Sequence, residues 1–164
     1  MEQERKFLIR KPSEEVISGL GVREIFAIRQ FYLVSTNEYE RRIRIRKRDG
    51  YEPEYFYTEK KHVSFGVREE NEKKIGRQEF LEYLYCVDFS RQHISKTRYV
   101  FDFRGNTFEM DIYDLESDFA ILEVELDNIN KNIALPSLQI IREVTGEKGF
   151  SNGEISKTGK LPRE

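Results

Sequence analysis

Charged residues alternate with other residues at the start of the chain, where positions 2–6 read Glu-Gln-Glu-Arg-Lys. If this segment is a β-strand, Glu2, Glu4 and Lys6 point to the same side, because the side chains of a strand alternate between its two faces. Two carboxylates and an ammonium group on one face could hold a divalent cation beside a phosphate. The spacing therefore indicates metal-assisted phosphate chemistry, provided that other segments supply further ligands.

Similar charged faces recur along the chain, with acids and bases largely sorted onto different segments. The basic faces comprise Arg42, Arg44 and Arg46, and Lys96 and Arg98; the acidic faces comprise Glu109 and Asp111, and Glu123 and Glu125; a mixed face carries Arg68, Glu70 and Glu72. One strand with a solvated face would explain any single segment. Their recurrence, dominated by arginine and glutamate, favours a shared charged interior. Arginine suits such a site because its guanidinium binds phosphate through two hydrogen bonds and stays charged at any working pH.

The elements that position these faces are mainly strands, which the period-2 alternation predicts. The expected strands are Glu2–Ile9, Glu24–Val34, Arg41–Arg48, Pro53–His62, Ser64–Ile75, Ser95–Arg104, Thr107–Asp114 and Phe119–Asp127. Eight antiparallel strands can close into a barrel just wide enough for side chains or one small ligand. We therefore expect an α+β protein built on a closed eight-stranded antiparallel β-barrel, with a few helices packed outside.

Three helices and a polar tail complete the expected elements. The helices are expected at Glu14–Leu20, Arg77–Tyr85 and Pro136–Glu143. Ser13 is placed to cap the first, and Pro136 suits the first turn of the third. Residues 151–164 are polar and contain glycine, which indicates a C-terminal tail or lid. Because there is no linker or internal repeat, we expect one domain over residues 1–164.

The charged faces would line the bore of this barrel if the apolar faces pack outward under the helices. Unpaired charges in a dry cavity cost many kcal/mol, so the bore must be wet, internally paired or occupied. The simplest occupant is a polyanion that basic residues hold and that divalent cations bridge to the carboxylates. Such oxygen ligands suit Mg²⁺ or Mn²⁺. The site would support phosphoryl or nucleotidyl transfer, in which positioning and charge neutralisation carry most of the catalysis.

The composition argues against several other classes of protein. The chain has 164 residues, with 28 basic and 30 acidic residues that leave a net charge of −2, so no nucleic-acid partner is expected. No apolar run approaches the ~20 residues of a membrane span, and charged residues follow Met1 directly, so neither a membrane segment nor a secretory signal is expected. The single cysteine, Cys86, cannot form an internal disulfide and suits a reducing cytoplasm. The oligomeric state stays open, with a homodimer among the alternatives.

Seven short motifs occur in order along nearly the whole chain. They are Glu2-Gln3-Glu4-Arg5-Lys6-Phe7, Arg44-Ile45-Arg46, Thr58-Glu59-Lys60, Arg68-Glu69-Glu70-Asn71-Glu72, Lys96-Thr97-Arg98-Tyr99, Glu109-Met110-Asp111 and Leu122-Glu123-Val124-Glu125-Leu126. Together they resemble the CYTH, or triphosphate tunnel metalloenzyme, superfamily, which opens with E-x-E-R-K-F. The resemblance implies an eight-stranded antiparallel tunnel. Members of that superfamily include class IV adenylate cyclases, thiamine triphosphatases and inorganic tripolyphosphatases.

The resemblance also implies a role for each charged position. The metal ligands would be Glu2, Glu4, Asp111, Glu123 and Glu125; the substrate-binding residues Lys6, Arg44, Arg46, Lys60, Arg68, Lys96 and Arg98; and the catalytic group Glu4, Lys6, Glu70 and Glu72. Glu70 and Glu72 resemble a further acidic pair that either binds a metal or orients water. The chain departs from the triphosphatase-like members at Gly149, where arginine is common, and Lys148 is the candidate to replace it.

Three functions are compatible with these patterns. The first is divalent-metal-dependent hydrolysis of a triphosphate-containing small molecule, either inorganic tripolyphosphate or a nucleoside triphosphate. The second is that of a class IV adenylate cyclase, which converts ATP to cyclic AMP and pyrophosphate in the same tunnel. The third is a barrel that binds polyphosphate or RNA with its basic strands alone, which leaves the acids of the other strands without a role. The E-R-K-F opening and the Val-Thr-Gly stretch at 144–146 favour the triphosphatase.

Overall fold

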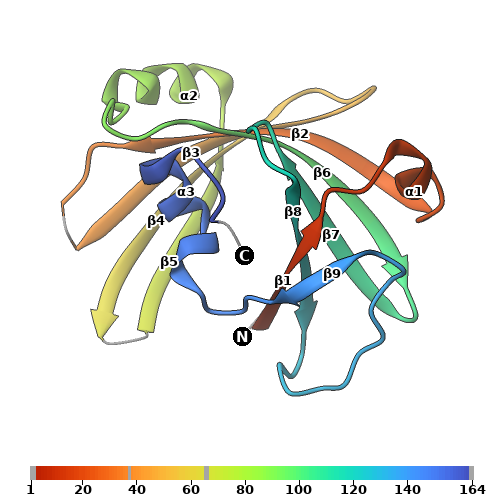
Figure 1. Ribbon diagram of the computed structural model, residues 1–164. Helices are drawn as coiled ribbons and strands as arrows, with labels where there is room; N and C mark the ends of the chain where they lie inside the picture. Colours follow the sequence, from red (N-terminus) through yellow and green to blue (C-terminus); the bar gives the residue numbers. More distant parts are fainter. Residues whose placement is uncertain (1–2, 37, 65–66, 163–164) are drawn as a thin grey trace.

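The computed structural model describes residues 3–36, 38–64 and 67–162, together with the side chains of all of these except 62–64 and 67–68. Figure 1 shows one strongly bent sheet with two helices outside it, α1 (Glu14–Ser18) and α2 (Arg77–Tyr83). Helix α3 (Asn152–Thr158) lies against the inner, concave side. The short 3-10 turns η1 (Leu84–Cys86) and η2 (Lys148–Phe150) follow α2 and precede α3.

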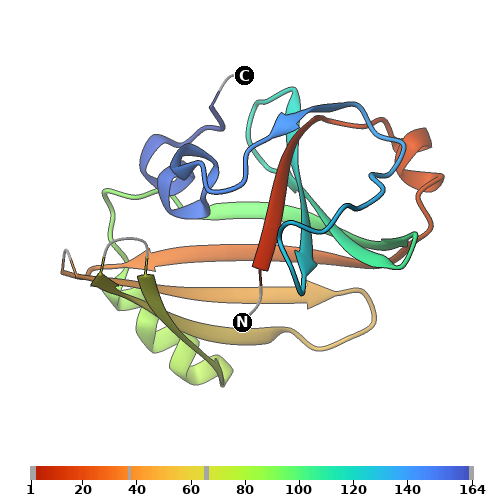
Figure 2. The same cartoon turned by 90° about the horizontal axis from the view of Figure 1, so that it is seen from below.

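The sheet contains nine strands among the described residues, and all of them pair antiparallel. They are β1 (Gln3–Arg10), β2 (Val22–Leu33), β3 (Tyr39–Arg48), β4 (Glu54–Ser64), β5 (Val67–Ile75), β6 (Ile94–Phe103), β7 (Asn106–Tyr113), β8 (Phe119–Leu126) and β9 (Ile140–Glu143). Their order is β5-β4-β3-β2-β6-β7-β8-β1-β9, so β5 and β9 form the edges. Seen from below, β1 (red) runs across the direction of β2 (orange), which shows how far the sheet bends between them (Figure 2).

The α+β class and all eight expected strands are confirmed, with strand ends that differ by a few residues. Ser13 caps α1 as expected, because its hydroxyl oxygen accepts a hydrogen bond from the backbone N–H of Val16 at 3.3 Å. Glu2, the first residue of the first expected strand, lies outside the described residues. In the part of the chain that the structure describes, no ladder joins β5 to β1 or β9, so closure of the barrel is not seen there.

The helix expected at Pro136–Glu143 is wrong, because residues 140–143 form the ninth strand instead. Strand β9 pairs with β1, whose other edge is already paired with β8. The backbone groups on this edge of β1 would otherwise lack partners, and the strand supplies them. Leu138 and Ile140 pack against the outer face of the sheet. At this spacing, Leu138 and Ile140 can cover the apolar outer face of the sheet from an extended chain as well as from a helix.

The segment expected to be a tail or lid contains α3. Ser151 caps the helix, since its side chain accepts a hydrogen bond from the backbone N–H of Glu154 at 3.2 Å. Arg91 ties the helix to the sheet by donating to the Ser156 hydroxyl and to the Gly153 carbonyl, both at 2.9 Å. Ile155 is fully buried. At least residues 152–158 are therefore part of the packed structure.

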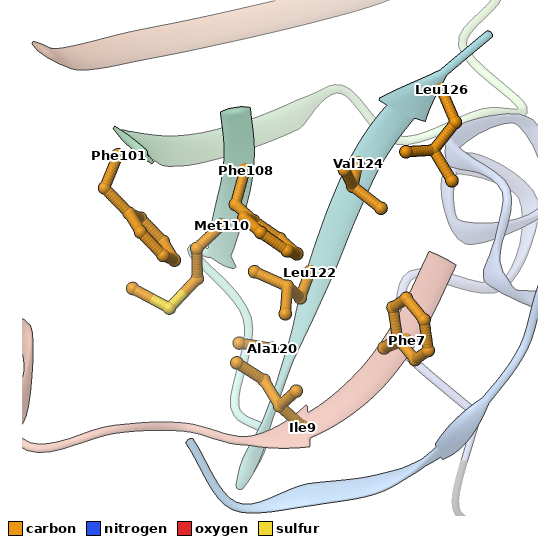
Figure 3. Packing of buried hydrophobic residues seen from close by; sticks show 9 residues of the cluster. All are labelled: Phe7, Ile9, Phe101, Phe108, Met110, Ala120, Leu122, Val124 and Leu126. Carbon is orange, nitrogen blue, oxygen red and sulfur yellow. The ribbon is translucent and has the colours of Figure 1, made fainter. Parts of the chain in front are cut away.

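Apolar side chains pack on both faces of the sheet, although the sequence led us to expect them outside. Figure 3 shows the outer cluster formed by β1, β6, β7 and β8, with Phe7, Phe108 and Leu122 among its members. A second outer cluster lies under α2. A third lies at one end of the inner face, where Leu8 and Ile121 pack with Ile155 of α3. The middle of the inner face is left to charged residues.

Residue Ile155 provides a test of how firmly α3 is held. Truncation to alanine leaves a cavity between α3 and the sheet, so Ile155→Ala should lower the free energy of unfolding by about 2–5 kcal/mol. Urea denaturation measures this loss. Ile25→Ala, at a half-exposed position of β2, should cost less than about 1 kcal/mol. Equal losses in the two variants would mean that α3 is not part of the cooperative fold.

Candidate functional site

A cavity of about 950 Å³ occupies the concave side of the sheet, and charged side chains dominate its lining. The lining residues expected from the sequence are Glu4, Lys6, Arg44, Lys60, Glu70, Glu72, Lys96, Arg98, Glu123 and Glu125. Two further expected residues, Arg46 and Asp111, do not line it. Glu2 lies outside the described residues, and nothing is described of the Arg68 side chain. The structure thus brings ten of the expected side chains to one cavity.

Strand register explains why the acids gather on one wall. Directly opposed residues of neighbouring antiparallel strands share a face, and residues two positions apart along a strand share it too. Glu123 of β8 is opposite Lys6 of β1 on one side and Glu109 of β7 on the other. Glu125 of β8 is opposite Glu4 of β1. Four carboxylates and one lysine therefore form a continuous patch across three strands.

Crowding of these carboxylates alters the acidity of Glu4. The Lys6 ammonium lies 3.4 Å from a Glu123 oxygen and 4.0 Å from a Glu4 oxygen, so one cation serves two acids. Burial first, and then the charge of Glu123, raise the pKa of Glu4 from 4.5 to about 7; Lys6 opposes this rise and Glu125 adds to it. Burial and the neighbouring carboxylates thus both favour the neutral form of Glu4.

The opposite wall carries arginines of β3 that carboxylates of β5 only partly satisfy. A guanidinium nitrogen of Arg44 lies 3.2 Å from Glu72, and one of Arg42 lies 3.9 Å from Glu70. The Nε atoms of Arg42, Arg44 and Arg46 are buried and have no hydrogen-bond partner among the described residues. Burial lowers the pKa of Arg44 to about 10, with Glu72 opposing and the other arginines adding to the fall. Arg44 still stays charged at neutral pH and would be stabilised by an anion.

Asp111 lies beneath the cavity and binds two of its cations. It accepts hydrogen bonds from Lys96 Nζ at 2.8 Å and from Arg98 Nε and a terminal nitrogen at 2.7 and 2.8 Å. Its side chain is 0% exposed and that of Lys96 is 1% exposed. Although burial favours the neutral acid, the charges of Lys96 and Arg98 and their hydrogen bonds hold the pKa of Asp111 well below its usual range. Asp111 therefore fixes the position of both bases.

Arg46, which was expected to bind substrate, is held by other partners. One of its nitrogens donates to Glu54 at 3.0 Å, and its guanidinium lies over the rings of Phe26 and Phe56 at 4.8 and 5.2 Å. This arrangement places Arg46 at the end of the charged patch on β3. The expectation that it contacts substrate stays a prediction.

Among the cavity residues that were not assigned roles from the sequence, Glu109 and Arg42 pair with or lie beside the expected bases. Glu109 lines it and pairs with Arg98 at 2.6 Å, and Arg42 lines it beside Arg44. Glu109 shares a face with Asp111, so alternation could not decide between the two. Their depth in the structure separates them, because Glu109 is partly exposed whereas Asp111 is fully buried. Arg42 lies near one end of its strand and was as compatible with a rim position as with the interior.

The C-terminal region supplies another wall of the cavity. Lys148 and Ser151 line it, as do Asn152 and other residues of α3. The Lys6 ammonium donates to the carbonyl oxygen of Phe150 at 3.5 Å, and the Tyr113 hydroxyl donates to the Asn152 side-chain oxygen at 2.7 Å. Lys148, the candidate to replace an arginine at Gly149, is exposed and lies 3.5 Å from Glu154.

No metal site is preformed in the part of the chain that the structure describes, which leaves out Glu2. There, no group of three or more histidine, cysteine, aspartate or glutamate side chains is arranged to hold an ion. None of the helices in the described ranges has the length and hydrophobicity that crossing a bilayer requires.

These features define a class of protein, namely a bent antiparallel sheet whose concave face opposes acidic and basic walls across one cavity. An inorganic triphosphatase of Acetivibrio thermocellus is 31% identical to the chain over 161 residues, which cover 95% of this chain and 93% of that protein. No profile of a known protein family matches the chain. The chain belongs to the CYTH, or triphosphate tunnel metalloenzyme, superfamily.

Solved structures agree with this membership. The crystal structure of the inorganic triphosphatase NE1496 has a TM-score of 0.63 at 27% identity, covering 99% of this chain and 97% of that one. A conserved hypothetical protein from Pyrococcus furiosus has a TM-score of 0.51 at 22% identity, covering 78% of this chain and 81% of that one. The second likeness concerns the fold alone.

The buried trio of Asp111, Lys96 and Arg98 makes a strong stability prediction. Asp111→Ala leaves the buried Lys96 without its counter-ion and Arg98 with only the partly exposed Glu109, so the free energy of unfolding at pH 7 should fall by about 3–5 kcal/mol. Urea denaturation measures it. Asp102→Ala, at an exposed aspartate on neighbouring β6, should cost less than about 1 kcal/mol. A small loss for Asp111→Ala would contradict the pairing described here.

Glu4 makes a prediction about pH. Because its pKa is raised to about 7 in the folded chain from an ordinary 4.5, its ionisation disfavours folding. This destabilisation is absent below pH 4.5, develops as the pH rises and is complete above pH 7. In EDTA, Glu4→Gln should therefore raise the Tm relative to the wild type at pH 8.5 but not at pH 4.5. A Tm difference that is the same at both pH values would show that Glu4 is not crowded.

Proposed function

We propose that the chain hydrolyses a triphosphate, either inorganic tripolyphosphate or a nucleoside triphosphate, with the help of a divalent metal ion. One observation carries the proposal: partly buried arginines of β3, whose buried Nε atoms lack partners among the described residues, face a crowded wall of carboxylates across one cavity. A polyanion would neutralise the arginines, and a divalent cation would neutralise the carboxylates. Similarity to the inorganic triphosphatase of A. thermocellus over nearly the whole chain supports the same activity.

The basic residues would bind and orient the phosphates. Arg42 and Arg44 have free Nε donors, and Arg98 and Lys96 are fixed in position by Asp111. Together with Lys60, which also lines the cavity, they surround the place of the polyanion. Charge spreads over the phosphoryl oxygens in the transition state of such transfers, and prepositioned cations stabilise it. Arg68 stays a predicted further contact.

The acidic wall fits Mg²⁺ or Mn²⁺. Glu4, Glu123 and Glu125 would supply carboxylate oxygens, which both ions prefer, and the neighbouring charges of Glu123 and Glu125, which add to the rise in the pKa of Glu4 that burial causes, support a cation there. Glu2 remains a predicted fourth ligand. A bound ion would supply Lewis-acid stabilisation of charge on the phosphoryl oxygens. Lys6, between Glu4 and Glu123, would hold these acids in place and reach the nearest phosphate.

The position of Asp111 changes the role that we propose for it. The resemblance implied a metal ligand, but its oxygens already accept three hydrogen bonds from Lys96 and Arg98. We therefore assign it a positioning role behind the substrate. Asp111 would act through those two bases.

The two edges of the sheet contribute to one site, which supports a closed tunnel in the ligand-bound state. Glu70 and Glu72 come from edge strand β5, whereas Glu4 and Lys6 come from β1 near the other edge. A metal-bound triphosphate between these edges would draw them together. A cytoplasmic location and a homodimer stay predictions.

A panel of substrates tests the proposed function. Tripolyphosphate, ATP, GTP and thiamine triphosphate would be incubated with Mg²⁺ or Mn²⁺ at neutral and alkaline pH. Release of orthophosphate supports a triphosphatase, whereas cyclic AMP with pyrophosphate would identify the cyclase alternative. If no triphosphate is turned over with either metal, the proposed function is wrong.

Glu4 is the residue whose loss should matter most for metal-dependent turnover. Glu4→Ala removes a carboxylate from the proposed metal site, so orthophosphate release should fall by about 10²-fold or more. Glu15→Ala, on exposed α1, serves as the control and should keep the wild-type rate. Wild-type phosphate release by Glu4→Ala would overturn the metal assignment.

A further inference from the structure

The cations of the cavity are already paired with its acids before any ligand binds. The pairs are Arg42 with Glu70 at 3.9 Å, Arg44 with Glu72 at 3.2 Å, Lys6 with Glu123 at 3.4 Å, and Arg98 with Glu109 at 2.6 Å. All eight side chains line the cavity. A polyanion that enters must therefore compete with carboxylates of the protein for the same basic groups.

The carboxylates that bind these cations differ in how far they are exposed to solvent. Asp111 is fully buried and binds Arg98 through two hydrogen bonds, so ligand cannot displace it without exposing the floor of the cavity. Glu72 and Glu70 are 38% and 50% exposed and belong to edge strand β5. These two can swing away into solvent at little cost.

The pairs formed by Glu70 and Glu72 are also incomplete. The Nε atoms of Arg42 and Arg44 lack partners among the described residues, so neither carboxylate makes the two-point contact of which a guanidinium is capable. Glu72 Oε1 is shared, since it accepts hydrogen bonds from both Arg44 and the buried Thr58, each at 3.2 Å. Thr58 thus directs Glu72 toward the arginine. A phosphate group offers more oxygens and a better fit.

We propose that Glu70 and Glu72 are internal counter-ions, which neutralise Arg42 and Arg44 in the ligand-free protein and are displaced by the bound polyanion. This inference rests on the proposed function and names a regulation of the same site. It replaces the catalytic role that the resemblance implied for this pair. Both acids weaken anion binding because their attraction to the arginines must be broken first. They also spare the empty cavity the cost of unpaired buried guanidinium groups.

Binding of tripolyphosphate in EDTA tests the proposal without turnover. Calorimetric titration should show Glu72→Gln binding about threefold to fivefold more tightly than the wild type, since an exposed pair of this kind contributes up to ~1 kcal/mol. Glu70→Gln should change the affinity in the same direction by less, because its pair is longer. Asp111→Asn should bind more weakly, because Lys96 and Arg98 lose their fixed positions.

Glu38→Gln is the matched control for general electrostatics. Glu38 lines the same cavity but makes no ion pair with any residue that the structure describes. Loss of its charge should improve the affinity by less than about twofold. If Glu72→Gln binds no more tightly than Glu38→Gln, or shows no measurable binding, the proposal is overturned.

Kinetics with Mg²⁺ separate a counter-ion from a catalytic group. A displaced counter-ion predicts that Glu72→Gln lowers KM and leaves kcat within about threefold of the wild type. A group that binds metal or orients water instead predicts a fall in kcat of about 10²-fold or more, which would overturn the proposal. Turnover of no triphosphate would refute the proposed function, whereas the comparison of Glu72→Gln with Glu38→Gln in EDTA would still decide the counter-ion role.

Discussion

Lys96 and Arg98 of the cavity lining are fixed by one fully buried carboxylate beneath them, Asp111, and the rest of the site is built on this trio. Asp111 can stay ionised there only because Lys96 and Arg98 surround it, and those bases can stay in place only because Asp111 holds them. The strand register sets this geometry, since Arg98 of β6 is directly opposite Asp111 of β7. A one-residue slip of β7 against its neighbours would turn Asp111 to the apolar outer face and leave both bases without it.

The same need to separate charge from apolar surface accounts for the helices. Outside the sheet, α1 and the segment before β9 cover one apolar cluster, and α2 covers another. Inside, the charged patch extends only along the middle of the strands, and α3 covers the apolar end beyond it. The helix therefore forms part of the core and at the same time a wall of the cavity, which couples the folding of the C-terminal segment to the shape of the site.

Alternation along the strands was enough to predict eight strands and nine of the ten lining residues, because charged residues recur at every second position; Lys60 was expected only from the family resemblance. It could not predict β9, since Leu138 and Ile140 suit a helix and an edge strand equally and only the unpaired edge of β1 decides between them. It could not distinguish Glu109 from Asp111, which share a face and differ only in depth. Nor could it place Arg46, whose guanidinium lies over the rings of Phe26 and Phe56 on the two neighbouring strands, because alternation gives the face of a side chain and not its partners there.

The cavity brings like charges together on each of its two walls, and the protein reduces their repulsion in a different way on each wall. The acidic wall relieves its crowding partly through Lys6 and partly through the raised pKa of Glu4. On the basic wall, Glu70 and Glu72 of edge strand β5 reduce the repulsion between Arg42 and Arg44. Asp111 would stay paired with Lys96 and Arg98 at all times, whereas Glu70 and Glu72 would be exchanged for ligand. The same sheet would then be stable without ligand and still able to bind it. The exchangeable acids are on edge strand β5, whereas the proposed metal ligands are on β1 and β8 near the other edge. Displacement of Glu70 and Glu72 by the polyanion would therefore act on one edge of the sheet, and neutralisation of the metal ligands on the other. These are the two edges that would have to meet in a closed tunnel.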